Sequence, residues 1–101
     1  MKYKYLVNFV FFIIAINIIS GCASSNNIGV QLFNQGEYDL AAGQWNQAAL
    51  AGDPYAQHNL GVLWRDGLGS TQRNLHEAAG WFVRSAQQGY VPAMVEAEKI
   101  Q

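Results

Sequence analysis

Hydrophobic and polar positions divide the chain into one apolar run and a longer part with helical periodicity. Residues 6–19 are apolar except for Asn8 and Asn17, and two lysines precede this run. A transmembrane helix needs about 20 consecutive apolar residues, so the run is short for one. A basic start, an apolar centre and small residues at the end are typical of an export signal. We therefore predict a signal peptide over residues 1–21.

The rest of the chain has apolar residues at helical spacing, separated by glycines and helix-capping residues. Gly36, Gly52 and Gly89 follow such segments, and Asp53-Pro54 combines an N-cap residue with a proline suited to the first helical position. The sequence shows neither the alternation of a strand nor an Asn-Gly hairpin. We predict an all-α fold with helices over about residues 27–34, 38–51, 54–65, 75–88 and 92–101.

An internal repeat organises these helices. Tyr38–Ala56 aligns without a gap with Leu75–Ala93 at an offset of 37 residues. The identical or similar pairs are Ala41 and Ala78, Ala42 and Ala79, Gly43 and Gly80, Trp45 and Phe82, Ala49 and Ala86, Gly52 and Gly89, and Ala56 and Ala93. Gly29 aligns with Gly61 at the smaller offset of 32, because the second hairpin has a longer turn. A period in the thirties predicts a short α-solenoid of two stacked helical hairpins plus a C-terminal capping helix, over residues 28–101.

The end of the apolar run carries the only cysteine of the chain, in Ile19-Ser20-Gly21-Cys22. These four residues resemble the lipobox of bacterial lipoproteins. The resemblance implies that diacylglycerol is attached to the Cys22 thiol and that a peptidase cuts before this residue. Residues 22–27 would then be a lipidated cysteine and a polar tether of at most roughly 20 Å. The alternative is an uncleaved membrane anchor with an unmodified cysteine.

The part from residue 56 onward resembles a Sel-one-like repeat. The pattern A-x-x-x-L-G-x-x-W-x-x-G-x-G is followed by E-A-A-x-W-F-x-x-S-A-x-x-G-x-x-x-A. The matching residues are Ala56, Leu60, Gly61, Trp64, Gly67, Gly69, Glu77, Ala78, Ala79, Trp81, Phe82, Ser85, Ala86, Gly89 and Ala93. The first hairpin resembles a tetratricopeptide unit, and the last helix resembles a terminal cap because it lacks the Leu-Gly pair. We expect Trp45, Trp64, Trp81 and Phe82 to fill the gaps between hairpins.

Composition and motifs argue against catalysis and nucleic-acid binding. Without residues 1–21, four cationic side chains face seven acidic ones, a formal charge of −3, so no basic surface is expected. His58 and His76 are the only histidines and lack metalloprotease spacing, and one cysteine cannot build a zinc site. The chain lacks a G-x-S-x-G motif and a phosphate-loop lysine. We expect no enzyme, no cofactor and no metal.

The family resemblance implies a partner-binding surface along the first helix of each hairpin. Counting from Gly61 and Gly29, the residues expected on that surface are Asn26, Val30, Phe33, Asn34, Tyr55, His58, Val62, Arg65 and Asp66. His58 and Arg65 stand out because they lie two helical turns apart on one face. The alternative, that these are ordinary solvated surface residues, stays open.

These observations lead to a functional hypothesis. We expect an envelope lipoprotein, anchored to a membrane through Cys22, that binds an envelope or secreted protein as an interaction or scaffold module. Because Ala23 rather than Asp follows the cysteine, the resemblance implies the outer membrane, facing the periplasm, if the source is diderm. The alternatives are an immunity lipoprotein that neutralises a secreted toxin, or an enzyme acting on cell-wall substrates. Stacked repeats need about three units to be stable, and this chain has two hairpins, so we also expect self-association.

Overall fold

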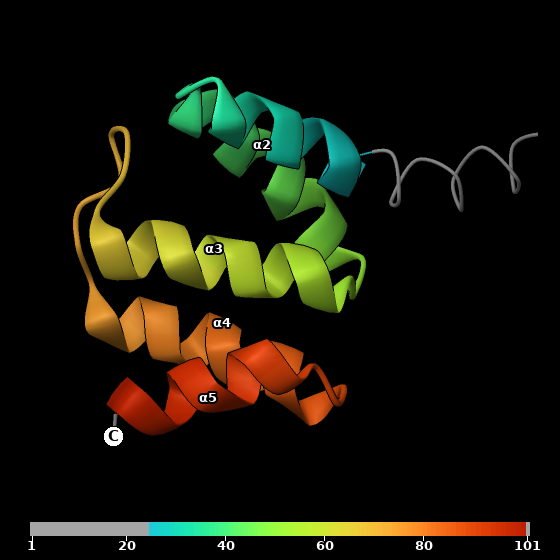
Figure 1. The fold of residues 1–101 in the computed structure, drawn as a ribbon, viewed down its shortest axis with the longest axis vertical. Helices are drawn as coiled ribbons and strands as arrows, with labels where there is room; N and C mark the ends of the chain where they lie inside the picture. The colour runs from blue at the N-terminus through green and yellow to red at the C-terminus, as the bar shows by residue number, and fades with distance from the viewer. Residues whose placement is uncertain (1–24, 101) are drawn as a thin grey trace, which may run out of the picture.

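The computed structural model describes residues 25–100, and its regular structure there is entirely helical, which confirms the prediction of an all-α fold. A helix over residues 25–34 precedes α2 (Tyr38–Leu50), α3 (Pro54–Asp66), α4 (Leu75–Gln87) and α5 (Val91–Ile100). The labelled helices pack mainly against their neighbours in the chain, α2 against α3, α3 against α4 and α4 against α5. Figure 1 shows the helices stacked in chain order, from the cyan N-terminal helix to α5 in red.

The observed helix ends agree with the predicted ones to within one or two residues. The largest difference is at the first helix, which already includes residues 25–27, assigned above to the tether. Cys22 and the predicted signal peptide lie outside the described residues.

Side-chain caps explain where α3 and α4 begin. The Asp53 carboxylate accepts hydrogen bonds from the backbone N–H groups of Tyr55, at 2.9 Å, and Ala56, at 3.4 Å. Asn74 Oδ1 accepts from the backbone N–H groups of His76 and Glu77, at 3.0 and 3.1 Å. Each cap satisfies two amide groups that have no partner within the first turn of their helix.

The two turns that the repeat aligns have the same backbone geometry. Gly52 and Gly89 both have positive φ, at 98° and 89°, a conformation that glycine adopts without a Cβ penalty. The residue after each glycine, Asp53 or Tyr90, donates its N–H to a carbonyl five residues earlier, at 3.0 and 3.4 Å. This pattern closes the C-terminus of a helix and turns the chain back, so the two helical corners match at an offset of 37 residues.

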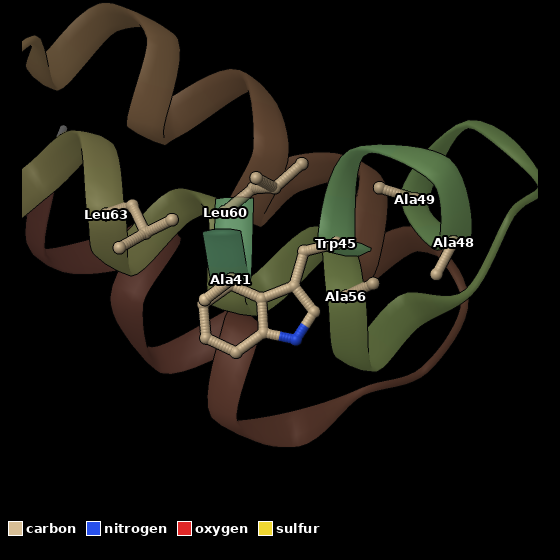
Figure 2. Close-up of a cluster of buried hydrophobic side chains, with 7 residues drawn as sticks. All are labelled: Ala41, Trp45, Ala48, Ala49, Ala56, Leu60 and Leu63. Carbon is tan, nitrogen blue, oxygen red and sulfur yellow. The ribbon is translucent and has the colours of Figure 1, made fainter. Parts of the chain in front are cut away.

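The core between α2 and α3 is built around one tryptophan. Trp45 is 2% exposed, and Figure 2 shows its indole among small and aliphatic side chains of both helices. The cluster consists of Ala41, Trp45, Ala48, Ala49, Ala56, Leu60 and Leu63. Alanines dominate the contact, which lets the two helix backbones come close while the indole fills the remaining space. Ala78, Phe82 and Ser85 of α4 and Ala93 of α5 are also buried.

Two glycines allow the large aromatic residues to lie directly against a helix backbone. A Cβ built on Gly29 would overlap the Trp45 indole. A Cβ on Gly61 would lie 2.5 Å from Phe82 Cε1. The same glycine–aromatic contact therefore occurs once in each hairpin, between the residues that the sequence repeat aligned.

The predicted burial of α3 needs one correction. Trp64 was expected to point inward, but it is only half-buried. Gln57, near the start of α3, is buried instead, with 6% exposure, and donates from Nε2 to the carbonyl of Ala49 at 3.1 Å. Trp81 is also half-buried, and the Arg84 guanidinium carbon lies 4.7 Å from its ring centroid.

The longer turn of the second hairpin is tied back to α2. Asp39 Oδ1 accepts hydrogen bonds from both the backbone N–H and the hydroxyl of Ser70, each at 2.8 Å. These hydrogen bonds hold the pKa of Asp39 below its ordinary value. The inserted residues thus form an ordered loop, drawn in yellow and orange in Figure 1.

Candidate functional site

One face of the molecule is shared by helix 25–34, α3 and α5, and we call it the first-helix face. Asn59 of α3 donates from Nδ2 to Asn26 Oδ1 in a long hydrogen bond of 3.5 Å. On the other side of α3, Arg65 donates from Nη1 to Glu96 Oε2 at 2.7 Å. Because α3 is linked in this way to both neighbours, the three helices present one continuous surface.

A small apolar pocket lies on this face between helix 25–34 and α3. It has a volume of about 160 Å³ and is lined by Val30, Phe33, Trp45, Asn59 and Val62. Three residues predicted for this surface, Val30, Phe33 and Val62, therefore meet in one place. Val30 is 40% exposed there, so apolar surface remains open to solvent.

Phe33 also has a structural role. Its ring lies edge-on to Tyr38, with ring centroids 5.2 Å apart, and is tilted against Trp45 at 5.6 Å. These contacts hold the first helix against α2 and fix the orientation of the ring. The pocket therefore has a rigid floor that is continuous with the core.

A charge cluster occupies the opposite end of the face. Arg65 makes a bidentate pair with Asp66, with Nε–Oδ1 and Nη2–Oδ2 distances of 2.8 and 2.9 Å. Its remaining amino group binds Glu96, which also accepts from Lys99 at 3.2 Å. The four side chains carry two positive and two negative charges. An acidic group of a partner therefore has to compete with Asp66 and Glu96 to bind Arg65.

The pKa values reflect this pairing. The hydrogen bond to Asp66 is the main reason why the pKa of Arg65 is raised, and its counterpart lowers the pKa of Asp66. Burial acts to raise the pKa of Glu96, but hydrogen bonds from Lys99 and Arg65 outweigh it and hold this pKa below its ordinary value. Both carboxyl groups are therefore ionised at neutral pH.

The predicted site residues His58 and Tyr55 belong to an aromatic cluster with Phe82 and Tyr90. The His58 ring is half-buried, with its centroid 5.5 Å from that of Phe82 and 5.3 Å from that of Tyr90. Tyr55 is 54% exposed, and its ring meets Tyr90 edge-on at 4.9 Å. Asn34 is exposed near the end of helix 25–34. His58 is thus partly a packing residue, whereas Tyr55 and Asn34 remain accessible.

Sequence reasoning missed three residues of this face, namely Asn59, Tyr90 and Glu96. The repeat could have indicated Glu96, because it lies 37 residues after Asn59. The two residues have corresponding roles: Asn59 links α3 to helix 25–34, and Glu96 links α5 to α3. Extending the offset into the last helix would have placed Glu96 on the face. Tyr90 aligns with Asp53, a capping residue, so its aromatic role has no counterpart in the first hairpin.

Within residues 25–100, the structure holds no group of three or more His, Cys, Asp or Glu side chains arranged to bind a metal ion. Every buried side-chain nitrogen or oxygen in that range has a hydrogen-bond partner. None of the described helices has the length and apolar character needed to cross a membrane.

Comparison with known proteins adds no family to this description. No protein-family model matches the chain, and no solved structure matches it. The resemblance to lipoproteins and to Sel-one-like repeats therefore rests on the sequence residues quoted above.

His58 gives the face a predictable pH dependence. Burial lowers the pKa of His58 below its ordinary value of 6.5. Two smaller effects act to raise it: the contact of His58 Nδ1 with Asn59 Oδ1, at 3.4 Å, and the negative charge of Glu96. Because the folded chain binds this proton more weakly than the unfolded chain, the free energy of unfolding should fall as the pH drops below about 6.5. The pKa values of Asp66 and Glu96 lie below 3.8 and 4.5, so their own contributions are lost only at lower pH.

We expect His58→Gln to flatten this dependence between about pH 5 and 7.5, as measured by urea unfolding at several pH values. The same substitution at the exposed His76 is the control for the loss of a histidine. An unchanged slope in His58→Gln would show that another group causes the acid sensitivity.

Proposed function

We propose that the chain is an envelope lipoprotein whose helical part, a short α-solenoid, binds another protein along the first-helix face. In this proposal Cys22 carries the lipid that holds the protein at a membrane. The observation that carries the binding proposal is the open apolar pocket at Val30, Phe33 and Val62, on a face shared by three helices. The partner is an envelope or secreted protein.

The repeated geometry supports the solenoid. Glycine–aromatic contacts recur at Gly29 with Trp45 and at Gly61 with Phe82. The corners at Gly52 and Gly89 share their hydrogen-bond pattern. In a solenoid each unit buries its apolar side against the next one, and the recurrence of both features is what such stacking requires.

The composition of the first-helix face supports binding of a protein. Protein interfaces combine an apolar or aromatic centre with a polar rim. Here the pocket and the exposed Tyr55 supply apolar and aromatic surface, while Asn34 and the Arg65 cluster supply polar groups. Tyrosine is among the residues that dominate binding energy at interfaces.

A photo-crosslinking experiment tests the binding face. A benzophenone side chain replaces Tyr55 in one version of the full chain and Leu40 of α2 in the other, because these positions are 54% and 59% exposed. On illumination in cells, we expect Tyr55 to give a discrete protein adduct and Leu40 to give none. Equal adduct patterns, or an adduct only from Leu40, would place the binding surface elsewhere.

Cys22→Ser tests the lipid anchor. Because the thiol is the proposed site of acylation, we expect the variant to lose incorporation of labelled fatty acid completely and to leave the membrane fraction. Ser24→Ala changes a nearby hydroxyl without touching the thiol and should keep the label. Fatty acid that remains on Cys22→Ser would disprove the anchor.

A further inference from the structure

One edge of the molecule brings together the start of helix 25–34 and two helical corners. Figure 1 shows this edge on the right, where helix 25–34 begins and where the chain turns from α2 to α3 and from α4 to α5. The Trp45 indole N–H donates to the carbonyl of Asn26 at 3.3 Å, which fixes the start of the first helix to α2. The Ser85 hydroxyl donates to the carbonyl of Pro54 at 2.7 Å, which joins the end of α4 to the first corner. We call this surface the corner edge, and it consists of residues 25–28, 48–54 and 86–92.

The corner edge exposes aliphatic side chains and carries little charge. Leu50 is 79% exposed, Val91 63% and Ile28 42%. Asp53 is the one charged residue of these three segments, and its carboxylate caps α3. The opposite edge, residues 35–38, 66–75 and 97–100, has five charged residues, namely Glu37, Asp66, Arg73, Glu98 and Lys99. An edge with exposed aliphatic side chains and almost no charge is typical of a surface that meets a protein or a membrane.

The position of Cys22 in the chain indicates which of these the corner edge meets. Cys22 precedes Ser25, the first residue of helix 25–34, by three residues, and three residues span at most about 11 Å. Because Asn26 is hydrogen-bonded to Trp45 of the core, the helix start cannot move away from the rest of the edge. A lipid on Cys22 therefore holds the corner edge beside the membrane, which is the apolar phase nearest to Leu50 and Val91.

We propose that the corner edge rests on the membrane that holds the lipid, with Leu50 and Val91 entering the layer between the headgroups and the acyl chains. This contact rests on the proposed function, because the anchor at Cys22 brings the edge to the membrane. Residues 25–28, 48–54 and 86–92 contain no Lys or Arg that could bind anionic headgroups. The contact is therefore apolar and needs only neutral phospholipid.

This placement orients the first-helix face. Its three helices, residues 25–34, α3 and α5, all begin at the corner edge. The face therefore stands upright on the membrane, and the Arg65 cluster at the end of α3 is far from the lipid. A partner reaches the pocket at Phe33 and Val62 from the side, above the membrane surface.

Photo-crosslinking to lipid tests the contact. A benzophenone side chain replaces Val91 in one version of the full chain and Leu40 in the other, because both positions are more than half exposed and Leu40 lies outside the corner edge. Each version is purified from membranes, placed in vesicles of phosphatidylcholine and illuminated, and the adducts are identified by intact mass. We expect Val91 to give at least about fivefold more phosphatidylcholine adduct than Leu40. Added salt should not change this ratio, because salt screens charges and not apolar contacts.

A charge at Leu50 tests whether the aliphatic side chains hold the edge on the lipid. Because a carboxylate is costly to take out of water, Leu50→Glu should reduce the lipid adduct of the Val91 version at least about threefold. Leu40→Glu is the matched control and should leave the adduct unchanged, with circular dichroism showing that both variants stay helical. Equal lipid adducts from Val91 and Leu40, or a Val91 adduct that Leu50→Glu does not reduce, overturn the proposal. A Val91 adduct to a second copy of the chain in place of lipid also overturns it.

The fatty-acid label on Cys22 separates this proposal from the proposed function. A chain without the label would overturn the lipid anchor and the membrane contact together. A labelled chain whose Val91 version gives no excess of lipid adduct would overturn only the membrane contact of the corner edge. The anchor and the binding proposal for the first-helix face would then still stand.

Discussion

Phe82→Ala is expected to lower the free energy of unfolding by about 3–5 kcal/mol. Phe82 is fully buried, its ring lies against the backbone at Gly61, and His58 packs at its side. Removing the ring leaves a cavity between α3 and α4 that alanine cannot fill. Since small domains are stable by about 5–15 kcal/mol in total, much of the folded population should be lost. Urea unfolding followed by circular dichroism at 222 nm, the usual helix signal, measures the change.

The neighbouring Val83→Ala is the matched control. Val83 is on the same helix but 41% exposed, so its truncation should change the stability by no more than about 0.5 kcal/mol. If both variants lost the same stability, Phe82 would not be the residue that joins α3 and α4.

The burial of Phe82 and Trp45 could be predicted because the repeat aligns them at an offset of 37 residues, and each faces one of the two glycines, Gly61 and Gly29, that align at an offset of 32. The positions of the helix ends could also be predicted from the sequence. They depend on local chemistry, such as the side-chain cap of Asp53 and the positive φ of Gly52 and Gly89, which the residue types indicate directly.

The orientation of α3 was harder to predict because it depends on neighbours distant in the sequence. Helical periodicity did not show that Trp64 stays partly exposed while Gln57 is buried. Gln57 is satisfied by the Ala49 carbonyl and by the amide of Gln88, at 3.1 and 2.8 Å. These partners come from α2 and from the end of α4, and the spacing of residues within α3 contains no information about them.

The candidate site likewise has one part that the sequence predicts and one part that it does not. The meeting of Phe33 and Val62 follows from aligning the two first helices. The pairing of Arg65 with Asp66 does not follow from this alignment, because adjacent residues on a helix usually face different directions. It forms where α3 ends, and Glu96 completes it from 31 residues away. Long side chains at helix ends choose among several partners, and only the packed structure decides between them.

Gly61→Ala is expected to lower the free energy of unfolding by about 1–2 kcal/mol, although alanine is the better helix former. The new Cβ would lie 2.5 Å from Phe82 Cε1, and the fully buried ring has little room to move. Overpacking of this kind costs about 1–3 kcal/mol. The gain in helix propensity returns at most about 1 kcal/mol, so the clash should dominate.

Gly80→Ala separates these two effects. Gly80 lies within α4, is exposed, and has no atom within 4 Å of the position that a Cβ would occupy. This variant should therefore be stabilised by about 0.5–1 kcal/mol, the propensity gain alone. Combining Gly61→Ala with Phe82→Ala should remove the clash, so the glycine substitution should cost less in that background than in the parent chain. A Gly61→Ala variant as stable as Gly80→Ala would mean that Phe82 does not lie against α3, and the glycine–aromatic contact would then not hold the two helices of the second hairpin together.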